Sequence, residues 1–231
     1  GITDHLHTLV NLPDIHRSYH NYLAVRDQDF HFGIELSVVS KWELDRINAG
    51  DYDPENPPVY GYRSDGPPSA EIDLGLDETQ INKLQIEYVV AGAHWPMYVP
   101  IELDALIRDY HRQQMFLARD PRVDIIAHPW WWDNRKASRG QQWAADFTLI
   151  PGSIHDEFIA AVKENNKLVE VNIGILLSNG YTEKYRHQYA EYLRFVCESG
   201  VRMTIGSDCH KSWYAFPKAE AQALLQPLGF R

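Results

Sequence analysis

The chain has 231 residues, of which 44% are hydrophobic and 23% charged, as is ordinary for one globular domain, which we expect to span residues 1–231. Its 22 basic and 32 acidic residues give a net charge of −10, which argues against a generic nucleic-acid surface because such a surface needs clustered positive charge. No apolar run approaches ~18 residues and no signal peptide is visible, so no membrane span is expected. Two cysteines are too few for a disulfide framework, and they favour a reducing compartment, the cytoplasm.

Six short apolar segments each run into a residue that can bind a metal. In chain order they are 1–3 before Asp4 and His5, 30–34 before Glu35, 88–93 before His94, 123–127 before His128, 168–171 before Asn172, and 203–207 before Asp208 and His210. One such segment would mean little. The series predicts parallel strands whose ends converge on one metal-binding mouth, as in a barrel.

Helical patterns separate several of these strand candidates. Helices are predicted over residues 101–117, 153–166 and 182–199, where apolar residues recur at helical spacing or boundary residues flank the segment. The Pro- and Gly-rich segment 51–68 has no periodicity and is predicted to be a surface loop. Strands that alternate with helices indicate an α/β fold with parallel strands. Within 30–35, His31 falls on the same face as Glu35, and we expect it inside the barrel rather than as a ligand.

The candidate ligands combine imidazoles with carboxylates, a set that suits zinc, manganese or iron better than magnesium or calcium. The candidates are the four histidines His5, His94, His128 and His210 and the two carboxylates Glu35 and Asp208. This number exceeds the needs of one tetrahedral ion, and a carboxylate can bridge two ions. Two ions about 3.5–4 Å apart form the usual clamp for hydrolysing phosphate esters. The residues therefore indicate a multinuclear hydrolase.

The same segments resemble the successive motifs of the polymerase and histidinol phosphatase (PHP) family. The resemblance is carried, in order, by Gly-Ile-Thr-Asp-His at 1–5, Gly-Ile-Glu at 33–35, Ala-His-Trp at 93–95, Ile-Ala-His-Pro at 126–129, Glu-Val-Asn at 170–172 and Gly-Ser-Asp-Cys-His at 206–210. It implies a distorted seven-stranded (β/α) barrel that holds two or three divalent metals. It also implies hydrolysis of a phosphate monoester or diester by a metal-bound hydroxide.

Carried over by position, the resemblance assigns a role to each ligand. It makes Glu35 the bridging carboxylate with Asp208 beside it, gives His94 and His128 to one metal, and gives His5 and His210 to another. These assignments rest on the family pattern and not on spacing.

The start of the chain departs from the family pattern, which normally opens with a His-x-His pair on the first strand. His5-Leu6-His7-Thr8 could be that pair. We favour the alternative, because residues 1–5 match the second motif residue by residue and only six strand candidates are found. The first strand is then absent from this chain, and His7 is a candidate substitute ligand. This departure puts full activity in question.

The segment after His128-Pro129 suits an anionic substrate, since three tryptophans (130–132) are followed by Arg135, Lys136 and Arg139. A solvated charge run is the equal alternative. Lys211 also follows a strand end and is a candidate substrate contact. The acidic net charge does not exclude an anionic substrate, because bound divalent cations invert the local electrostatic field. We expect a small phosphorylated substrate, with a short oligonucleotide also compatible.

Two other functions compete with the phosphoesterase. A degenerate metal-binding domain with a structural or binding role is the first, because one motif is absent. An amidohydrolase-type hydrolase is the second, but such enzymes usually carry a bridging lysine, and no apolar segment here ends in lysine. The sequence thus favours a metal-dependent phosphoesterase and leaves its substrate open.

Overall fold

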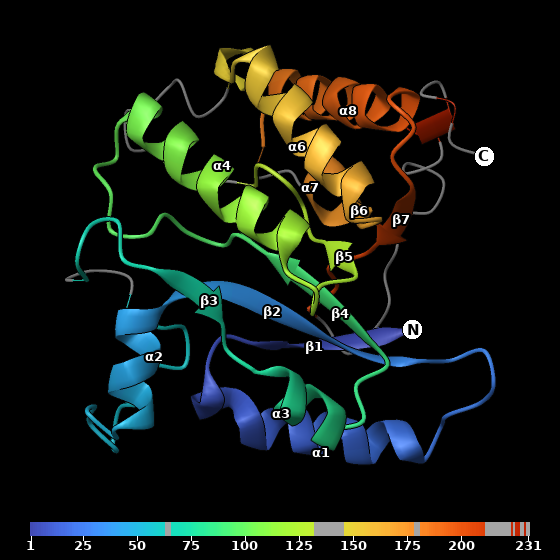
Figure 1. Cartoon of the computed structure of the whole chain (residues 1–231). Coiled ribbons are helices and arrows are strands. Elements are labelled where there is room, and N and C mark those ends of the chain that lie inside the picture. The colour runs from blue at the N-terminus through green and yellow to red at the C-terminus, as the bar shows by residue number, and fades with distance from the viewer. Residues whose placement is uncertain are drawn as a thin grey trace. The chain divides into compact units, whose positions relative to one another are not determined.

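The computed structural model describes residues 1–62, 66–131, 146–177 and 181–210, together with positions 223, 225, 226 and 229. The chain divides into two units, Gly1–Ile126 and Ala127–Arg231, and each combines strands with helices (Figure 1). Within the described residues, no helix has the length and apolar character needed to cross a membrane. The expectation of one domain over residues 1–231 stays a prediction.

The first unit is built on parallel strands in the order β1, β2, β4 and β5. They span Ile2–Leu6, Phe32–Ser40, Tyr88–Gly92 and Ile125–Ile126. A short strand β3, Ile72–Leu74, pairs antiparallel with the C-terminal end of β2. Three residues are too few to show the alternation by which a strand is recognised, so the sequence pattern did not predict β3.

Helices α1 and α4 cover the two faces of this sheet, α1 against β1 and β2, and α4 against β4 and β5 (Figure 1). The helical elements of this unit are η1 (Leu9–Asn11), α1 (Leu12–Leu23), α2 (Lys41–Asn48), α3 (Glu78–Lys83) and α4 (Leu103–Arg119). Helix α2 begins where the Ser40 side chain accepts a hydrogen bond from the Glu43 backbone N–H. The described part of 51–68 contains neither helix nor strand, as expected of a loop.

Strand β2 carries the alternation that places the functional side chains. Phe32 and Ile34 are at most 1% exposed and belong to one face, which packs into the core. Glu35 and Ser37 belong to the opposite face. Two polar positions separated by one residue are thereby presented together, which is the local basis of the site described below.

His31 lies outside this alternation, because β2 begins one residue later. Its imidazole is 53% exposed and pairs with the Glu87 carboxylate at 2.7 Å. The expectation that His31 faces a barrel interior is therefore wrong, and the residue belongs to a surface ion pair.

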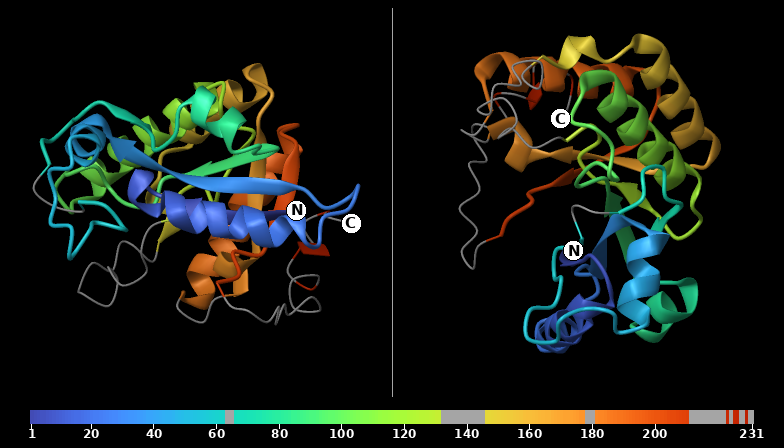
Figure 2. Two further views of the ribbon diagram at one scale, coloured as in Figure 1. Left: turned by 90° about the horizontal axis from the view of Figure 1, so that it is seen from below. Right: turned by 90° about the vertical axis from the view of Figure 1, so that its left-hand side faces the viewer.

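The second unit contains the parallel pair β6 (Leu168–Asn172) and β7 (Met203–Gly206), in which Asn172 lies opposite Gly206. Its other described elements are η3 (Phe147–Leu149), α6 (Gly152–Glu164), α7 (Ile173–Leu177) and α8 (Glu183–Glu198). Helices α6 and α8 lie side by side (Figure 2). The rings of His155 on α6 and Tyr192 on α8 are in contact, with centroids 4.7 Å apart.

The predicted elements are largely confirmed. All six apolar segments are strands, and the helices predicted over 101–117, 153–166 and 182–199 are α4, α6 and α8, with ends displaced by at most two residues. The expected α/β class with parallel strands is confirmed. The closed seven-stranded barrel and the absence of its first strand stay predictions.

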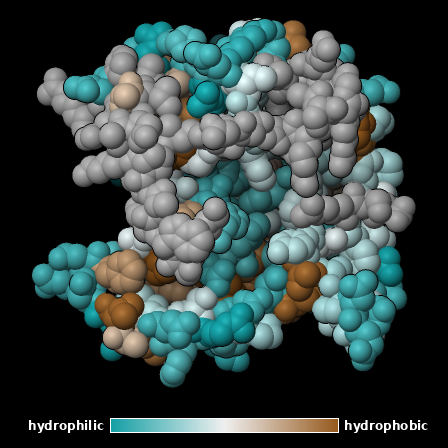
Figure 3. Space-filling model, turned by 180° about the vertical axis from the view of Figure 1, so that it is seen from behind, coloured by the Kyte–Doolittle hydropathy of each residue, from teal (hydrophilic) through white to brown (hydrophobic). Residues whose placement is uncertain are grey.

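The described surface is mainly hydrophilic on the face shown in Figure 3, where apolar residues form small separate patches. Among the described residues, the large apolar side chains that are more than half exposed are Val25, Tyr60 and Ile205. Scattered apolar side chains of this kind are ordinary in globular proteins. They indicate no docking surface by themselves.

Candidate metal site

Three predicted ligands of the first unit come together, and we call His5, Glu35 and His94 the first ligand group. His5 on β1 is the register partner of Glu35 on β2, and His94 lies two residues after β4. One potential ligand atom from each side chain lies within 4.8 Å of the others. Register partners on neighbouring strands share a face, which explains why His5, 30 residues before Glu35, meets it.

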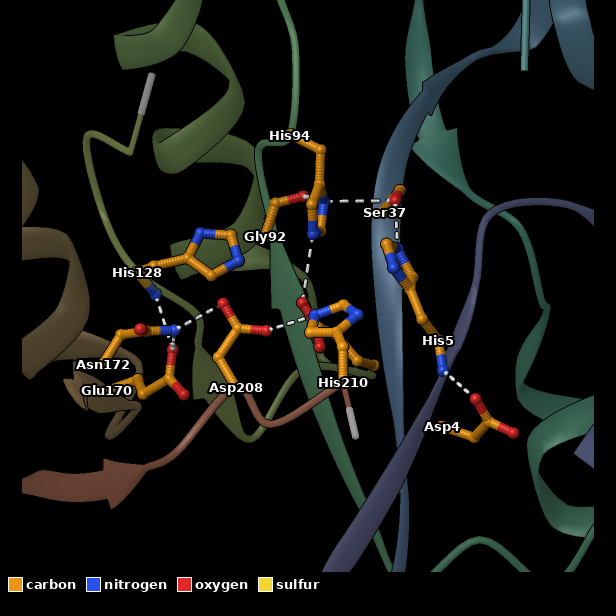
Figure 4. A network of polar contacts seen from close by, with 11 residues as sticks. Asp4, His5, Ser37, Gly92, His94, His128, Glu170, Asn172, Asp208 and His210 are labelled. Carbon is orange, nitrogen blue, oxygen red and sulfur yellow. Dashed lines mark hydrogen bonds and ion pairs between the residues drawn. The ribbon is translucent and has the colours of Figure 1, made fainter. Parts of the chain in front are cut away.

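The His94 ring is oriented by the backbone of its own strand. Its Nδ1 lies 3.2 Å from the carbonyl oxygen of Gly92 and 3.1 Å from the Ser37 hydroxyl (Figure 4). A carbonyl only accepts hydrogen bonds, so Nδ1 carries the hydrogen. In the neutral ring the other nitrogen, Nε2, then holds a lone pair. This tautomer, fixed by a bond at the far nitrogen, is the form that binds metals.

The Nε2 atom of His94 faces the Glu35 carboxylate at 3.1 Å. Two electron-rich atoms at this distance repel unless a cation lies between them, either a proton on the ring or a metal ion. The side chains are also sheltered, with exposed fractions of 8% for His94 and 19% for Glu35. The donor set and its geometry thus fit a divalent metal of the zinc type.

The same face of β2 has an aromatic neighbour two residues before Glu35. A Cβ atom on Gly33 would lie 2.4 Å from the ring of Tyr88, its register partner, so only glycine lets this ring cross the strand. Burial raises the pKa of Tyr88 to about 12. Tyr88 therefore stays neutral and adds no competing charge on this face.

The remaining predicted ligands belong to the second unit, and we call His128, Asp208 and His210 the second ligand group. His210 Nε2 lies 2.7 Å from Asp208 Oδ1. The Asn172 amide donates to the other oxygen of Asp208 and to the Glu170 carboxylate, each at 3.3 Å. Glu170 in turn accepts the backbone N–H of His128 at 2.9 Å (Figure 4). The three predicted ligands are thus linked through Glu170 and Asn172.

The backbone at these positions is special. His128 and Asp208 both have left-handed backbone conformations, with φ of 26° and 49°, in the segments that follow β5 and β7. Such conformations are rare for residues other than glycine, and they cluster at functional sites. A Cβ on Gly206 would lie 1.8 Å from a Glu170 carboxylate oxygen, so a larger residue there would displace that carboxylate.

Ser37 and Glu170, which organise these groups, were not predicted as site residues, and Asn172 was predicted only as a metal-capable residue at the end of a strand. Glu170 is 8% exposed and Asn172 is fully buried. The signal for both was present, because a glutamate inside the apolar run Leu-Val-Glu-Val-Asn must find a buried partner. Ser37 carried no comparable signal beyond its place two residues after Glu35.

His7 lies outside the first ligand group. Its ring is 2% exposed, and its Nε2 lies 2.7 Å from the carboxylate of Glu43, which is fully buried. The same carboxylate accepts the backbone N–H of Tyr62. A Cβ on Gly61 would lie 2.0 Å from His7 Nε2, so the loop backbone packs directly on this pair. The contacts make His7 an anchor for the loop and give no support to it as a substitute ligand.

The predicted substrate contacts Arg135, Lys136, Arg139 and Lys211 lie outside the described residues. Two of the three tryptophans are described. Trp130 is 1% exposed and belongs to the core, and the ring of Trp131 packs edge-on against His128 with centroids 5.1 Å apart. Trp130 therefore packs in the core, whereas Trp131 lies beside a predicted ligand.

Solved structures provide the comparison with known proteins, since no family model and no curated protein matches the chain. Histidinol phosphate phosphatase from Lactococcus lactis subsp. lactis, solved with zinc, L-histidinol and phosphate, covers 99% of this chain and 94% of its own length, at 13% identity and a TM-score of 0.49. The HisK protein of Listeria monocytogenes, named for histidinol phosphatase, covers 87% and 71% at 11% identity and a TM-score of 0.51. The second likeness shows a shared fold, in agreement with the PHP-like motifs.

Proposed function

We propose that this protein is a metal-dependent phosphoesterase that hydrolyses a phosphate monoester or diester. The observation that carries the proposal is the first ligand group, in which His94 Nε2 faces Glu35 at 3.1 Å and His5 lies within 4.8 Å of both. Imidazole and carboxylate donors on the ends of parallel strands are the arrangement from which metal-dependent hydrolases build their sites.

When bound, a divalent metal of this kind lowers the pKa of a coordinated water and neutralises charge on a phosphoryl group. The protein chain holds the candidate ligands in position. Strands β1 and β2 hold His5 and Glu35 in register, and the Gly92 carbonyl keeps the His94 ring in its metal-binding tautomer. Because strand pairing places these side chains on one face, they are already gathered when a cation binds.

The choice of phosphate esters rests on two supports. The first is the ordered set of motifs, which resembles the PHP family from residue 1 to residue 210. The second is the fold shared with the Listeria protein that is named for histidinol phosphatase. A small phosphorylated substrate is the simplest reading, and Arg135, Lys136, Arg139 and Lys211 stay predicted contacts for its anionic part.

The number of candidate donors supports more than one ion. The first ligand group alone fills three positions, and the second adds His128, Asp208 and His210. We propose two or three divalent ions, drawn from zinc, manganese or iron, with Glu35 as the bridging carboxylate implied by the family resemblance. Cytoplasmic localisation stays a prediction.

The test is turnover coupled to metal content. The protein is stripped with a chelator, reloaded separately with zinc, manganese or iron, and assayed with an aryl phosphate monoester and diester while elemental analysis counts ions per chain. We expect two or three ions and chelator-sensitive turnover. Bound metal without turnover of either ester under any of the three metals would contradict the proposal. One ion or none, again without turnover, would favour a binding module instead.

A further inference from the structure

The Ser37 hydroxyl contacts two candidate metal ligands at once. Its Oγ lies 2.7 Å from Nε2 of His5 and 3.1 Å from Nδ1 of His94 (Figure 4). Ser37 is fully buried, so its hydroxyl cannot reach a substrate. It can act only through the two rings that it touches.

The hydrogens of this network can be assigned from chemistry. His94 Nδ1 donates, because it also faces the Gly92 carbonyl at 3.2 Å. Ser37 therefore accepts on that side, and its single hydrogen is left for its other neighbour. Donation to His5 Nε2 satisfies the buried hydroxyl, whereas the reverse arrangement would leave its hydrogen unpaired at a cost of about 1–3 kcal/mol.

The assignment places the Ser37 hydrogen on a lone pair that a metal could use. An imidazole nitrogen has one lone pair, so His5 Nε2 cannot accept the Ser37 hydrogen and bind a metal at the same time. The hydrogen on His5 then lies on Nδ1, which is the tautomer suited to metal binding through Nε2. The ring is thus held in the correct form by a bond that metal binding must break.

We propose that Ser37 is a positioning residue that occupies His5 Nε2 and competes with the metal for it. This inference rests on the proposed metal-dependent function and adds that Ser37 lowers the affinity for the metal. A hydrogen bond that exists only before metal binding stabilises the metal-free protein and so lowers metal affinity. Most residues that hydrogen-bond to a histidine ligand contact the ring nitrogen that does not bind the metal, and they raise metal affinity.

Replacing Ser37 with alanine tests whether Ser37 lowers the affinity for zinc. The variant removes the bond to His5, whereas His94 keeps its bond to the Gly92 carbonyl and so its orientation. The metal-free form is therefore destabilised more than the metal-loaded form. We expect the zinc dissociation constant of Ser37→Ala to fall by about three- to tenfold, the range of one net hydrogen bond.

Ser40 provides the matched control on the same strand. It is also fully buried, and its hydroxyl accepts the Glu43 backbone N–H and lies 3.1 Å from the Tyr98 hydroxyl, away from the first ligand group. Ser40→Ala should lower stability with and without metal alike. Its zinc dissociation constant should therefore equal that of the unaltered protein.

The experiment is a zinc titration against a chelating dye, run on unaltered protein, Ser37→Ala and Ser40→Ala after metal removal. Tighter binding by Ser37→Ala alone supports the proposal. Equal or weaker binding by Ser37→Ala overturns it and leaves the phosphoesterase proposal standing if unaltered protein still binds zinc. Failure of unaltered protein to bind zinc overturns both.

A second readout does not depend on the variants. Nitrogen-15 NMR of the histidine rings in the metal-free protein reports which nitrogen carries the hydrogen. We expect the hydrogen on Nδ1 in both His5 and His94. A hydrogen on Nε2 of His5 would overturn the proposal even if Ser37→Ala failed to fold.

Discussion

The two ligand groups are held in different ways. In the first, His5 and Glu35 are register partners on neighbouring strands, and the His94 side chain is 8% exposed. In the second, Asp208 and His210 follow β7 in a segment with a left-handed residue, and the His210 side chain is 76% exposed. Sheet hydrogen bonds fix the first group before any cation arrives, whereas the second depends on side-chain bonds. We infer that the first group dominates metal affinity.

The largest expected effect comes from removing one ligand from each group. Glu35→Gln preserves shape but removes the carboxylate that His94 faces, so zinc affinity should fall by more than about 100-fold, beyond the usual cost of losing a supporting residue. His210→Gln removes an exposed ligand and should cost only about tenfold. Zinc titration of both variants measures the difference. Equal losses would contradict the ranking of the two groups.

A smaller effect is expected from the residue that links the second group. Asn172→Ala removes the donor shared by Glu170 and Asp208, and we expect a loss of no more than about tenfold in zinc affinity or in turnover, the lower end of the usual range for a supporting residue. Asn165→Ala is the control, because its amide donates to the backbone carbonyl of Ala161 and to no ligand group within the described residues. Unchanged affinity and turnover in Asn172→Ala would show that the second group needs no such link.

The smallest effect concerns a carboxylate of the first unit outside the ligand group. Hydrogen bonds from His31, the Phe32 backbone and Tyr22 lower the pKa of Glu87 from 4.5 to about 2. A carboxyl group with a lowered pKa stabilises the fold above its ordinary value, and this contribution is lost as pH falls from 4.5 toward 2.

Glu87→Gln isolates that contribution. The difference in unfolding free energy between unaltered protein and Glu87→Gln should shrink steadily as pH falls through this window, as measured by denaturant unfolding at several pH values. Zinc affinity should stay unchanged, which makes this variant the surface control for Glu35→Gln. A difference that does not vary with pH would mean that the ion pair with His31 contributes nothing.

The strands and ligands were predictable because both leave local signals. An apolar run of strand length predicts a strand, and a histidine or carboxylate at its end is exposed to the mouth wherever parallel strands converge. His5, Glu35 and His94 were found in this way, and the structure brings them within 4.8 Å. The short strand β3 and the short helices α2 and α3 were not predicted, because so few residues show no clear periodicity.

The roles of individual polar side chains could not be predicted from local pattern. His7 and His5 look equivalent in the sequence, yet one is bonded to Glu43, 36 residues away, and the other to Ser37, 32 residues away. Such partners depend on strand register and on the paths of loops. A pattern with a period of two residues carries no information about them.

The amino-acid sequence by itself determined the α/β class, the strand positions and the residue types that can bind metal, because these depend on local periodicity and donor chemistry. Only the tertiary structure decided which donors meet, which tautomer each ring adopts, and that Ser37, Glu170 and Asn172 hold them. The physical reason is that a hydrogen bond has a partner and a direction. Both are set when distant segments pack, and the spacing of residues along the chain specifies neither of them.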